Sequence, residues 1–182
     1  MKIVTDLEYI KEKALEREKE NWEFRALLKE LDMAPKEIDA IVHEINDEVT
    51  SQIDCTQCAN CCKQIRPVLD KDDVSKLAFG LGNEVSEFRE RYLSQDTDNA
   101  TKFVFELPCP FLANNKCSNY DCRPKDCRSY PHLHKRDFTS RLWGVIENYG
   151  ICPIVFNVYE QLKTELWDND SFENDDFDYE WE

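Results

Sequence analysis

The stretch Asp54–Lys63 reads DCTQCANCCK and places four cysteines within eight residues. Cys55, Cys58 and Cys61 follow one another at even C-x2-C spacing, and Cys62 comes directly after them. An isolated cysteine often serves as a small apolar core residue. These four instead lie among Asp, Thr, Gln, Asn and Lys side chains, so the pattern predicts metal ligation.

The cysteine count and the start of the chain bear on the redox state of the thiols. Nine cysteines cannot pair completely within one chain. The first residues have no apolar signal-peptide core, and no apolar run approaches the roughly 18–20 residues of a membrane span. We therefore expect a cytoplasmic protein, in which thiols stay reduced and metal ligation is favoured over disulfides.

The spacing of the cysteines also bears on the kind of metal. Structural zinc sites usually take two ligands from each of two C-x2-C pairs. Three thiols at C-x2-C-x2-C spacing, with a distant Cys-Pro, are typical of an iron–sulfur cluster. Two such steps occur, Cys109-Pro110 and Cys152-Pro153. Because Cys62 lies outside this scheme and eight thiolates also suit two zinc ions, the spacing favours an iron–sulfur cluster only slightly.

Basic side chains gather near the later cysteines. Residues 109–141 contain seven Lys or Arg and three Asp, in a chain with a net charge of −15. A centre with four thiolates carries about −2 and is tuned by hydrogen bonds. We expect Lys63, Arg66, Arg123 and Arg128 to offset this charge. An anionic-substrate or nucleic-acid patch is the alternative, although the net charge argues against nonspecific binding to nucleic acid or to anionic membranes.

Apolar periodicity predicts a mainly α-helical fold. We expect a small single domain with one short β-hairpin and irregular loops organised around the cysteine site. Helices are predicted over 5–32, 35–53, 70–80 and 84–93 and from Pro153 onward, a strand over 102–107 and a turn over 113–117. Little periodicity is visible over 118–151.

Composition divides the chain into three segments. Residues 1–34 are predicted to form an N-terminal amphipathic helix, and residues 35–167 the cysteine-cluster metal-binding domain. Residues 168–182 carry eight acidic and no basic side chains, which predicts a disordered tail. The helix and the tail are candidate surfaces for a protein partner.

Four motifs occur in order: C-x2-C-x2-C-C, P-C-P-F-L, R-P-x2-C-R-x-Y-P and C-P. Over about residues 55–162 the chain resembles the YkgJ-type cysteine-cluster proteins, a zinc- or iron-chelating domain family with a CxxCxxCC motif. The resemblance implies eight metal ligands: Cys55, Cys58, Cys61, Cys62, Cys109, Cys117, Cys127 and Cys152. Cys122 lies outside the family pattern. Together with His132 and His134 it is a reserve ligand.

The resemblance leaves several functions open. The metal of such a cytoplasmic module is either structural or redox-active. A distant relative, flagellin lysine N-methylase, is longer and suggests a protein-lysine N-methyltransferase-like, metal-dependent enzyme; metal trafficking or sensing is a further alternative. The chain has four glycines and no Gly-rich turn after a strand. The first cysteine gap also differs from the C-x3-C-x2-C of radical adenosylmethionine enzymes. We therefore lean away from an enzyme, identify no catalytic residue and expect metal removal to destabilise the domain.

Overall fold

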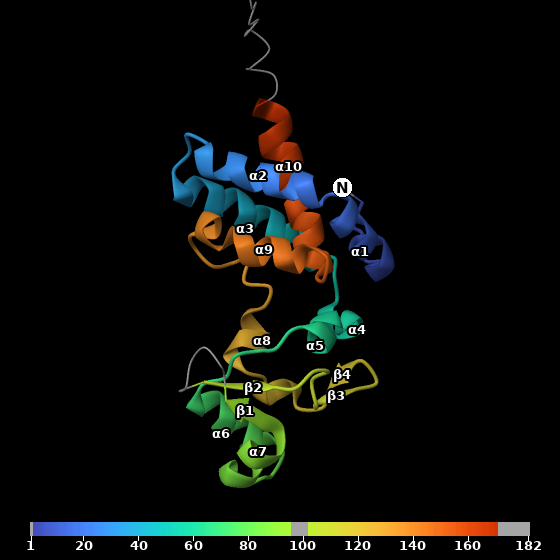
Figure 1. The fold of residues 1–182 in the computed structure, drawn as a ribbon, viewed down its shortest axis with the longest axis vertical. Coiled ribbons are helices and arrows are strands. Elements are labelled where there is room, and N and C mark those ends of the chain that lie inside the picture. The colour runs from blue at the N-terminus through green and yellow to red at the C-terminus, as the bar shows by residue number, and fades with distance from the viewer. Residues whose placement is uncertain (1, 96–101, 171–182) are drawn as a thin grey trace, which may run out of the picture. The chain divides into compact units, whose positions relative to one another are not determined.

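The computed structural model describes residues 2–95 and 102–170. The chain is mainly helical with two short antiparallel strand pairs (Figure 1), which confirms the predicted fold class. It forms two compact units, one from Met1–Ile53 and Pro131–Glu182 and one from Asp54–Tyr130. The three-segment division stays a prediction, and residues 171–182 of its acidic tail lie outside the described residues. None of the described helices has the length and apolarity to cross a bilayer.

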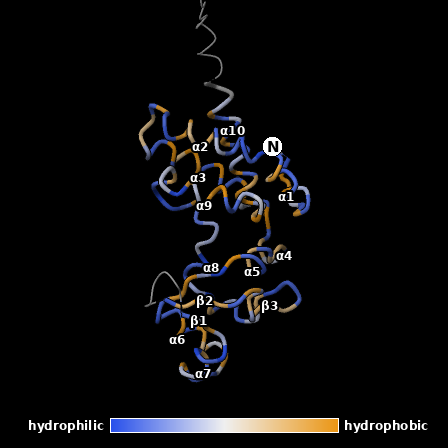
Figure 2. The backbone as a smooth tube through the Cα atoms, viewed as in Figure 1, coloured by the Kyte–Doolittle hydropathy of each residue, from blue (hydrophilic) through white to orange (hydrophobic). Residues whose placement is uncertain are grey.

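The helical unit consists of Met1–Ile53 and Pro131–Glu182, and its helix α10 (Pro153–Asp170) packs against several of the other helices. Polar and apolar residues alternate along α2 (Glu18–Glu30) and α3 (Pro35–Ser51) (Figure 2), as expected for helices that bury one face. The described elements are α1 (Leu7–Glu16), α2 (Glu18–Glu30), α3 (Pro35–Ser51), the 3-10 helix η2 (Phe138–Arg141), α9 (Leu142–Tyr149) and α10 (Pro153–Asp170).

The first two helices differ from the single helix predicted over residues 5–32. The chain leaves helical geometry at Arg17, with φ −100° and ψ 16°. The Arg17 guanidinium pairs with Glu160 of α10, so the break accompanies a tertiary contact that helical periodicity does not reveal. Sequence analysis also missed α9, which lies in the segment with little apparent periodicity.

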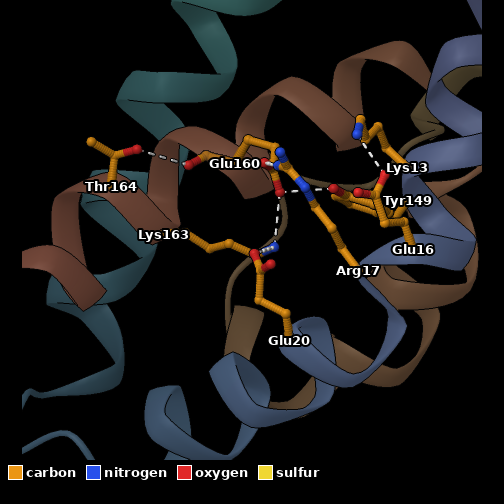
Figure 3. Close-up of polar contacts among 8 residues, drawn as sticks. All are labelled: Lys13, Glu16, Arg17, Glu20, Tyr149, Glu160, Lys163 and Thr164. Atoms are coloured by element: carbon orange, nitrogen blue, oxygen red, sulfur yellow. Dashed lines mark hydrogen bonds and ion pairs between the residues drawn. The ribbon is translucent and has the colours of Figure 1, made fainter.

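A polar cluster links α1, α2, α9 and α10 within this unit (Figure 3). Glu160 accepts hydrogen bonds from Arg17, from the Tyr149 hydroxyl at 2.7 Å and from Lys163 Nζ at 2.8 Å. Lys163 also donates to Glu20 at 2.6 Å, and its side chain is 8% exposed. Each buried charge therefore has an opposite charge and a hydrogen-bond partner, as its burial requires.

Asp39 of α3 anchors the start of η2. Its carboxylate accepts hydrogen bonds from the backbone N–H groups of Asp137 and Phe138, both at 2.8 Å. Asp39 is 7% exposed and Phe138 is 1% exposed, so these donors have little access to water. The carboxylate therefore holds the connection before α9 against α3.

Asp39→Ala should lower the free energy of unfolding by about 2–4 kcal/mol, because it leaves two shielded N–H donors without their charged acceptor. Urea denaturation followed by circular dichroism measures this loss. Glu44→Ala, at an exposed position of the same helix, is the matched control and should change stability by less than about 0.5 kcal/mol. Equal effects of the two substitutions would contradict the anchoring role.

The cysteine unit, Asp54–Tyr130, is built from short elements around a small apolar core. Its buried core residues are Leu69, Val74, Leu77, Ala78, Phe88, Phe105 and Phe111. The described elements are α4 (Cys55–Cys58), α5 (Asn60–Gln64), α6 (Lys71–Gly80), α7 (Val85–Tyr92), β1 (Leu93–Gln95), β2 (Phe103–Phe105), β3 (Leu112–Ala113), β4 (Lys116–Cys117), the 3-10 helix η1 (Tyr120–Cys122) and α8 (Lys125–Ser129).

Two antiparallel pairs complete this unit. Ser94 of β1 lies opposite Val104 of β2, and Leu112 of β3 lies opposite Cys117 of β4. The predicted turn over 113–117 forms the β3–β4 connection, where Asn114 and Asn115 have φ of 50° and 59°. Asparagine tolerates this left-handed conformation, which suits a tight hairpin. Sequence analysis did not predict β1, since it assigned the start of this strand to a helix end.

Carboxylates attach α8 to the rest of the cysteine unit. Asp70 caps α6 by accepting from the Asp73 N–H at 2.9 Å. Asp73, which is 2% exposed, accepts from the Lys125 N–H at 3.0 Å, and the Lys125 ammonium pairs with Asp70 at 2.8 Å. Asp126 accepts from the Val68 N–H at 3.1 Å. Two of these hydrogen bonds join a backbone N–H group to a carboxylate, one at Lys125 and one at Asp126. They fix the position of α8 more closely than the ion pair of Lys125 would do by itself.

The 3-10 helix η1 packs closely on the last turn of α6. Asn119 donates to the Leu77 carbonyl at 3.1 Å. A Cβ atom added at Gly80 would lie 2.3 Å from Asn119 Oδ1 and 2.7 Å from Cys122 Sγ. Only a residue without a side chain fits there, because both distances are below van der Waals contact.

Gly80→Ala should therefore lower the free energy of unfolding by about 1–3 kcal/mol through overpacking. Gly144→Ala is the matched control, since its added Cβ meets nothing within 4 Å. The control should instead stabilise α9 by about 0.5–1 kcal/mol. Thermal melts compare the two variants, and stabilisation by both would refute the close approach at Gly80.

Candidate metal centre

Eight of the nine cysteines lie in the cysteine unit, and Cys152 lies in the helical unit. Cys55 is exposed, Cys152 is buried, and the other seven are half-buried. The eight in the cysteine unit are Cys55, Cys58, Cys61, Cys62, Cys109, Cys117, Cys122 and Cys127. Short elements or turns carry all of them, so the contacts between these elements decide how the cysteines are grouped.

The opening motif folds into two short helices. Asp54 caps α4 by accepting from the Thr56 N–H at 2.9 Å and from the Thr56 hydroxyl at 2.7 Å. Cys55 and Cys58 are three residues apart in this turn, which places them on one face. Ala59 then adopts φ 52° and ψ 13°, in the left-handed region. This left-handed residue ends α4 and precedes α5, which carries the adjacent Cys61 and Cys62.

Backbone hydrogen bonds link α5 to the β3–β4 hairpin. The Cys109 N–H donates to the Cys62 carbonyl at 2.9 Å, and the Leu112 N–H donates to the Cys109 carbonyl at 3.0 Å. Leu112 in turn lies opposite Cys117 across the hairpin. Cysteines separated by 47 and 8 positions in the sequence are therefore brought together by main-chain contacts.

The thiol pKa values show which cysteines are neighbours. Burial raises the pKa of Cys109 to about 11, with further increases from Cys62 and Cys117. Burial raises the pKa of Cys127 to about 12, followed by effects of Cys109, Cys62 and Cys117. Burial also raises the pKa of Cys117, and Cys62 adds to it. Each of the four sulfurs thus lies within electrostatic reach of the other three.

Two further interactions involve the opening motif. A hydrogen bond from the Cys61 thiol lowers the pKa of Cys62 to about 6, and Arg123 and Lys63 act in the same direction. Partial burial of the sulfur, and then its neighbour Cys58, raise the pKa of Cys55. Cys55 and Cys58 therefore form a neighbouring pair, while Cys61 contacts Cys62.

The four predicted charge-offsetting residues have different surroundings. Arg123 lies close enough to lower the pKa values of Cys55, Cys62 and Cys117. Its side chain is fixed over the Tyr120 ring at 3.4 Å and donates to the Tyr120 carbonyl at 3.0 Å. Arg123 therefore places one positive charge near several thiols. Lys63 also lowers the pKa of Cys62.

Arg66 and Arg128 have other partners. Arg66 pairs with Glu106 at 3.3 Å, and both side chains are more than half exposed. Arg128 donates to the Arg123 carbonyl at 2.5 Å and so supports the backbone at Arg123. Asp73, which sequence analysis did not single out, fixes the start of the helix that carries Cys127. Its signal was the spacing of two Asp residues around a helix start, a capping pattern.

The three reserve ligands, and Cys152 as the eighth ligand that the resemblance implies, have the following surroundings. Cys122 packs against Gly80. His132 and His134 belong to the helical unit, where burial lowers the pKa of His134 and His132 adds to that decrease. Cys152 is 7% exposed and donates its N–H to the Asn148 carbonyl at 2.9 Å before α10. Their ligand roles stay predictions.

The donor chemistry of the cysteine unit fits zinc or iron, both of which bind thiolate sulfur. Across residues 2–95 and 102–170, no three His, Cys, Asp or Glu side chains already stand at positions that could hold an ion. Binding would accordingly require the neighbouring sulfurs to move toward one another, with loss of their protons.

Comparison with known proteins agrees with this chemistry. Residues 54–144, half of the chain, match the CxxCxxCC family, which is described as "Putative zinc- or iron-chelating domain". The match covers the whole cysteine unit and the first part of the following segment. No curated protein and no solved structure gave a significant match. By its family match and its gathered thiols, the chain belongs to the CxxCxxCC family of zinc- or iron-chelating domains.

Proposed function

We propose that this chain is a cytoplasmic metal-binding protein whose cysteine unit is stabilised by zinc or iron. The observation that carries the proposal is the concentration of eight cysteines in Asp54–Tyr130. That unit has a seven-residue buried apolar core, with Cys109 and Cys117 packed against it. A core this small gives limited stability without a further constraint, and bound metal supplies one.

The C-x2-C-x2-C spacing of Cys55, Cys58 and Cys61 supports an iron–sulfur cluster that is structural or transfers electrons. The additional thiols support zinc, which takes four ligands in a closed structural site, and these can all be thiolates. Of the two, we favour the cluster slightly on spacing. The positive charge of Arg123 suits either, since both centres carry net negative charge.

A role in metal delivery is the second candidate. Cys55 is exposed, and it lies beside Cys58 in the single-turn helix α4. An accessible thiol pair can take up a metal ion from, or release it to, another thiol ligand by stepwise exchange. A purely structural site would instead be expected to shield all of its ligands.

The experiment that tests this function is anaerobic purification followed by metal analysis, absorption spectroscopy and thermal unfolding. The purified chain should contain stoichiometric metal. A brown protein with about four irons, bleached by dithionite, would support the cluster. A colourless protein with zinc would support the structural zinc site instead. In either case chelation should lower the unfolding temperature, because bound metal contributes directly to folding free energy.

The control is the same chelator treatment followed by restoration of the metal, which should recover the original melt. Metal-free protein with an unchanged unfolding temperature would contradict the proposal. Metal analysis without the melt is insufficient, because exposed thiols also acquire metal adventitiously.

Removal of the Arg123 guanidinium provides a further test of the proposed metal binding. Arg123→Gln should weaken metal binding about 10–100-fold, the usual range for groups that support metal ligands. Arg66→Gln is the matched control, because Arg66 pairs with Glu106 on the surface. Competition with a chromophoric chelator measures both affinities. Similar affinities for Arg123→Gln and the unsubstituted chain would show that the guanidinium supports only the Tyr120 turn.

A further inference from the structure

A cavity of about 630 Å³ lies in the cysteine unit where α6, α7, β1 and β2 meet. No cysteine belongs to the residues described around it, so the cavity is separate from the candidate metal centre. We propose that it binds a small organic acid, whose carboxylate is held by Lys71 and Arg89 and whose apolar body lies against Phe103. This inference goes beyond the proposed metal binding, because it assigns a ligand that is not a metal.

One wall of the cavity is a face of α7. Ser86, Arg89 and Glu90 line the cavity, and their spacing of three and four positions places them on one side of this helix. Phe88 belongs to the buried core of the unit, whereas the three lining residues are exposed. The helix therefore buries Phe88 and presents a hydroxyl, a guanidinium and a carboxylate to the cavity.

The floor of the cavity is one face of the β1–β2 pair. Leu93 and Gln95 are alternate residues of β1, so their side chains leave the same face of the strand. Gln95 lies directly opposite Phe103 of β2, and residues opposite each other in an antiparallel pair share a face. All three line the cavity, and Leu93 and Phe103 are half-buried. They provide the apolar surface against which the body of a ligand can pack.

The remaining wall is the start of α6. The Leu69 N–H donates to the Phe103 carbonyl at 2.8 Å, and the Phe103 N–H donates to the Leu69 carbonyl at 3.0 Å. These two hydrogen bonds tie the chain before α6 to β2. The helix begins at Lys71, shortly after this contact, and Lys71 therefore lines the same cavity as Phe103.

The positive charges of the cavity are not neutralised by ion pairs. Within residues 2–95 and 102–170, neither Lys71 nor Arg89 pairs with a carboxylate. Arg89 instead lies over the Phe103 ring, with its guanidinium carbon 4.6 Å from the ring centroid. A guanidinium that stacks on a ring by its face keeps the N–H groups of its edge available for a carboxylate. Since Glu90 is the one acidic residue described in the lining, the cavity has a net positive charge.

These properties favour a monocarboxylic acid with a flat or compact apolar body. The volume of the cavity lies in the range of about 300–1,000 Å³ that is usual for small-molecule sites. Arg89 can hold a carboxylate by two parallel N–H bonds, and Lys71 supplies a second positive charge. Glu90 repels a dianion such as a phosphate more strongly than a monoanion. Leu93 and Phe103 then select an apolar body, because contact with it removes their remaining surface from water.

The test uses the full chain as purified, with benzoate as the probe and benzamide as its neutral isostere. Saturation-transfer NMR titrations measure both affinities. Benzoate should bind about tenfold more tightly than benzamide, because its charge strengthens the hydrogen bonds. Arg89→Gln should weaken benzoate binding about 10–100-fold. Arg91→Gln is the matched control and should leave binding unchanged, since Arg91 lies over Tyr92 at 5.2 Å and does not line this cavity.

Ser86→Phe supplies a second measurement that leaves the charge of the cavity unchanged. Its added ring should fill the α7 side and abolish benzoate binding, and a thermal melt checks that this exposed substitution leaves folding intact. Metal content should be equal in all variants, which separates binding in the cavity from coordination of benzoate to a bound metal. Equal benzoate affinities of Arg89→Gln and Arg91→Gln, equal binding of benzoate and benzamide, or no binding to the unsubstituted chain would overturn the proposal.

Discussion

The burial of thiols that lie close together is the constraint on which the proposed metal site of the cysteine unit depends. Burial raises the pKa values of Cys109, Cys117 and Cys127, and neighbouring thiols raise them further. The unit has no excess of positive side chains, since it contains 11 Lys or Arg and 12 Asp or Glu. A bound cation would favour ionising several of these thiols together, which is the physical reason why we expect metal removal to destabilise the unit.

The carboxylates of this unit have a different task. Asp54, Asp70, Asp73 and Asp126 all accept backbone N–H groups, at the starts of α4, α6 and α8 and at Val68. Such contacts fix the ends of short helices that have few buried residues of their own. Lys125 neutralises part of this acidic group. The basic groups closest to the thiols, Arg123 and Lys63, are not drawn into these carboxylate contacts.

Sequence reasoning succeeded where local chemistry determines the structure. Pro35, Asp70 and Pro153 mark helix starts, and the apolar periodicity behind them matches α3, α6 and α10. It failed where a distant contact decides the outcome. The break at Arg17 accompanies a partner 143 residues away, and Arg66 pairs with Glu106 across 40 residues.

The candidate metal site, like the fold, was predicted only in part from the sequence. The identity of the cysteines could be read from their spacing, but their grouping could not. Grouping depends on the Cys62–Cys109 backbone bond and on Asp126, neither of which has a local pattern. The position of Cys62 outside the even spacing left an arrangement with two zinc ions open, but the spacing did not identify the neighbours of Cys62.

The separation of ligand types gives the chain a basis for metal selection. Hard cations such as Mg²⁺ and Ca²⁺ prefer carboxylate oxygen, while zinc and iron bind thiolate well. Outside Asp54–Tyr130 the sequence has one cysteine and 26 Asp or Glu against 12 Lys or Arg. Inside it, Asp54 and Asp126, each next to a cysteine, accept backbone N–H groups. With eight cysteines in this unit, we expect thiolate softness rather than charge alone to decide which metal it binds.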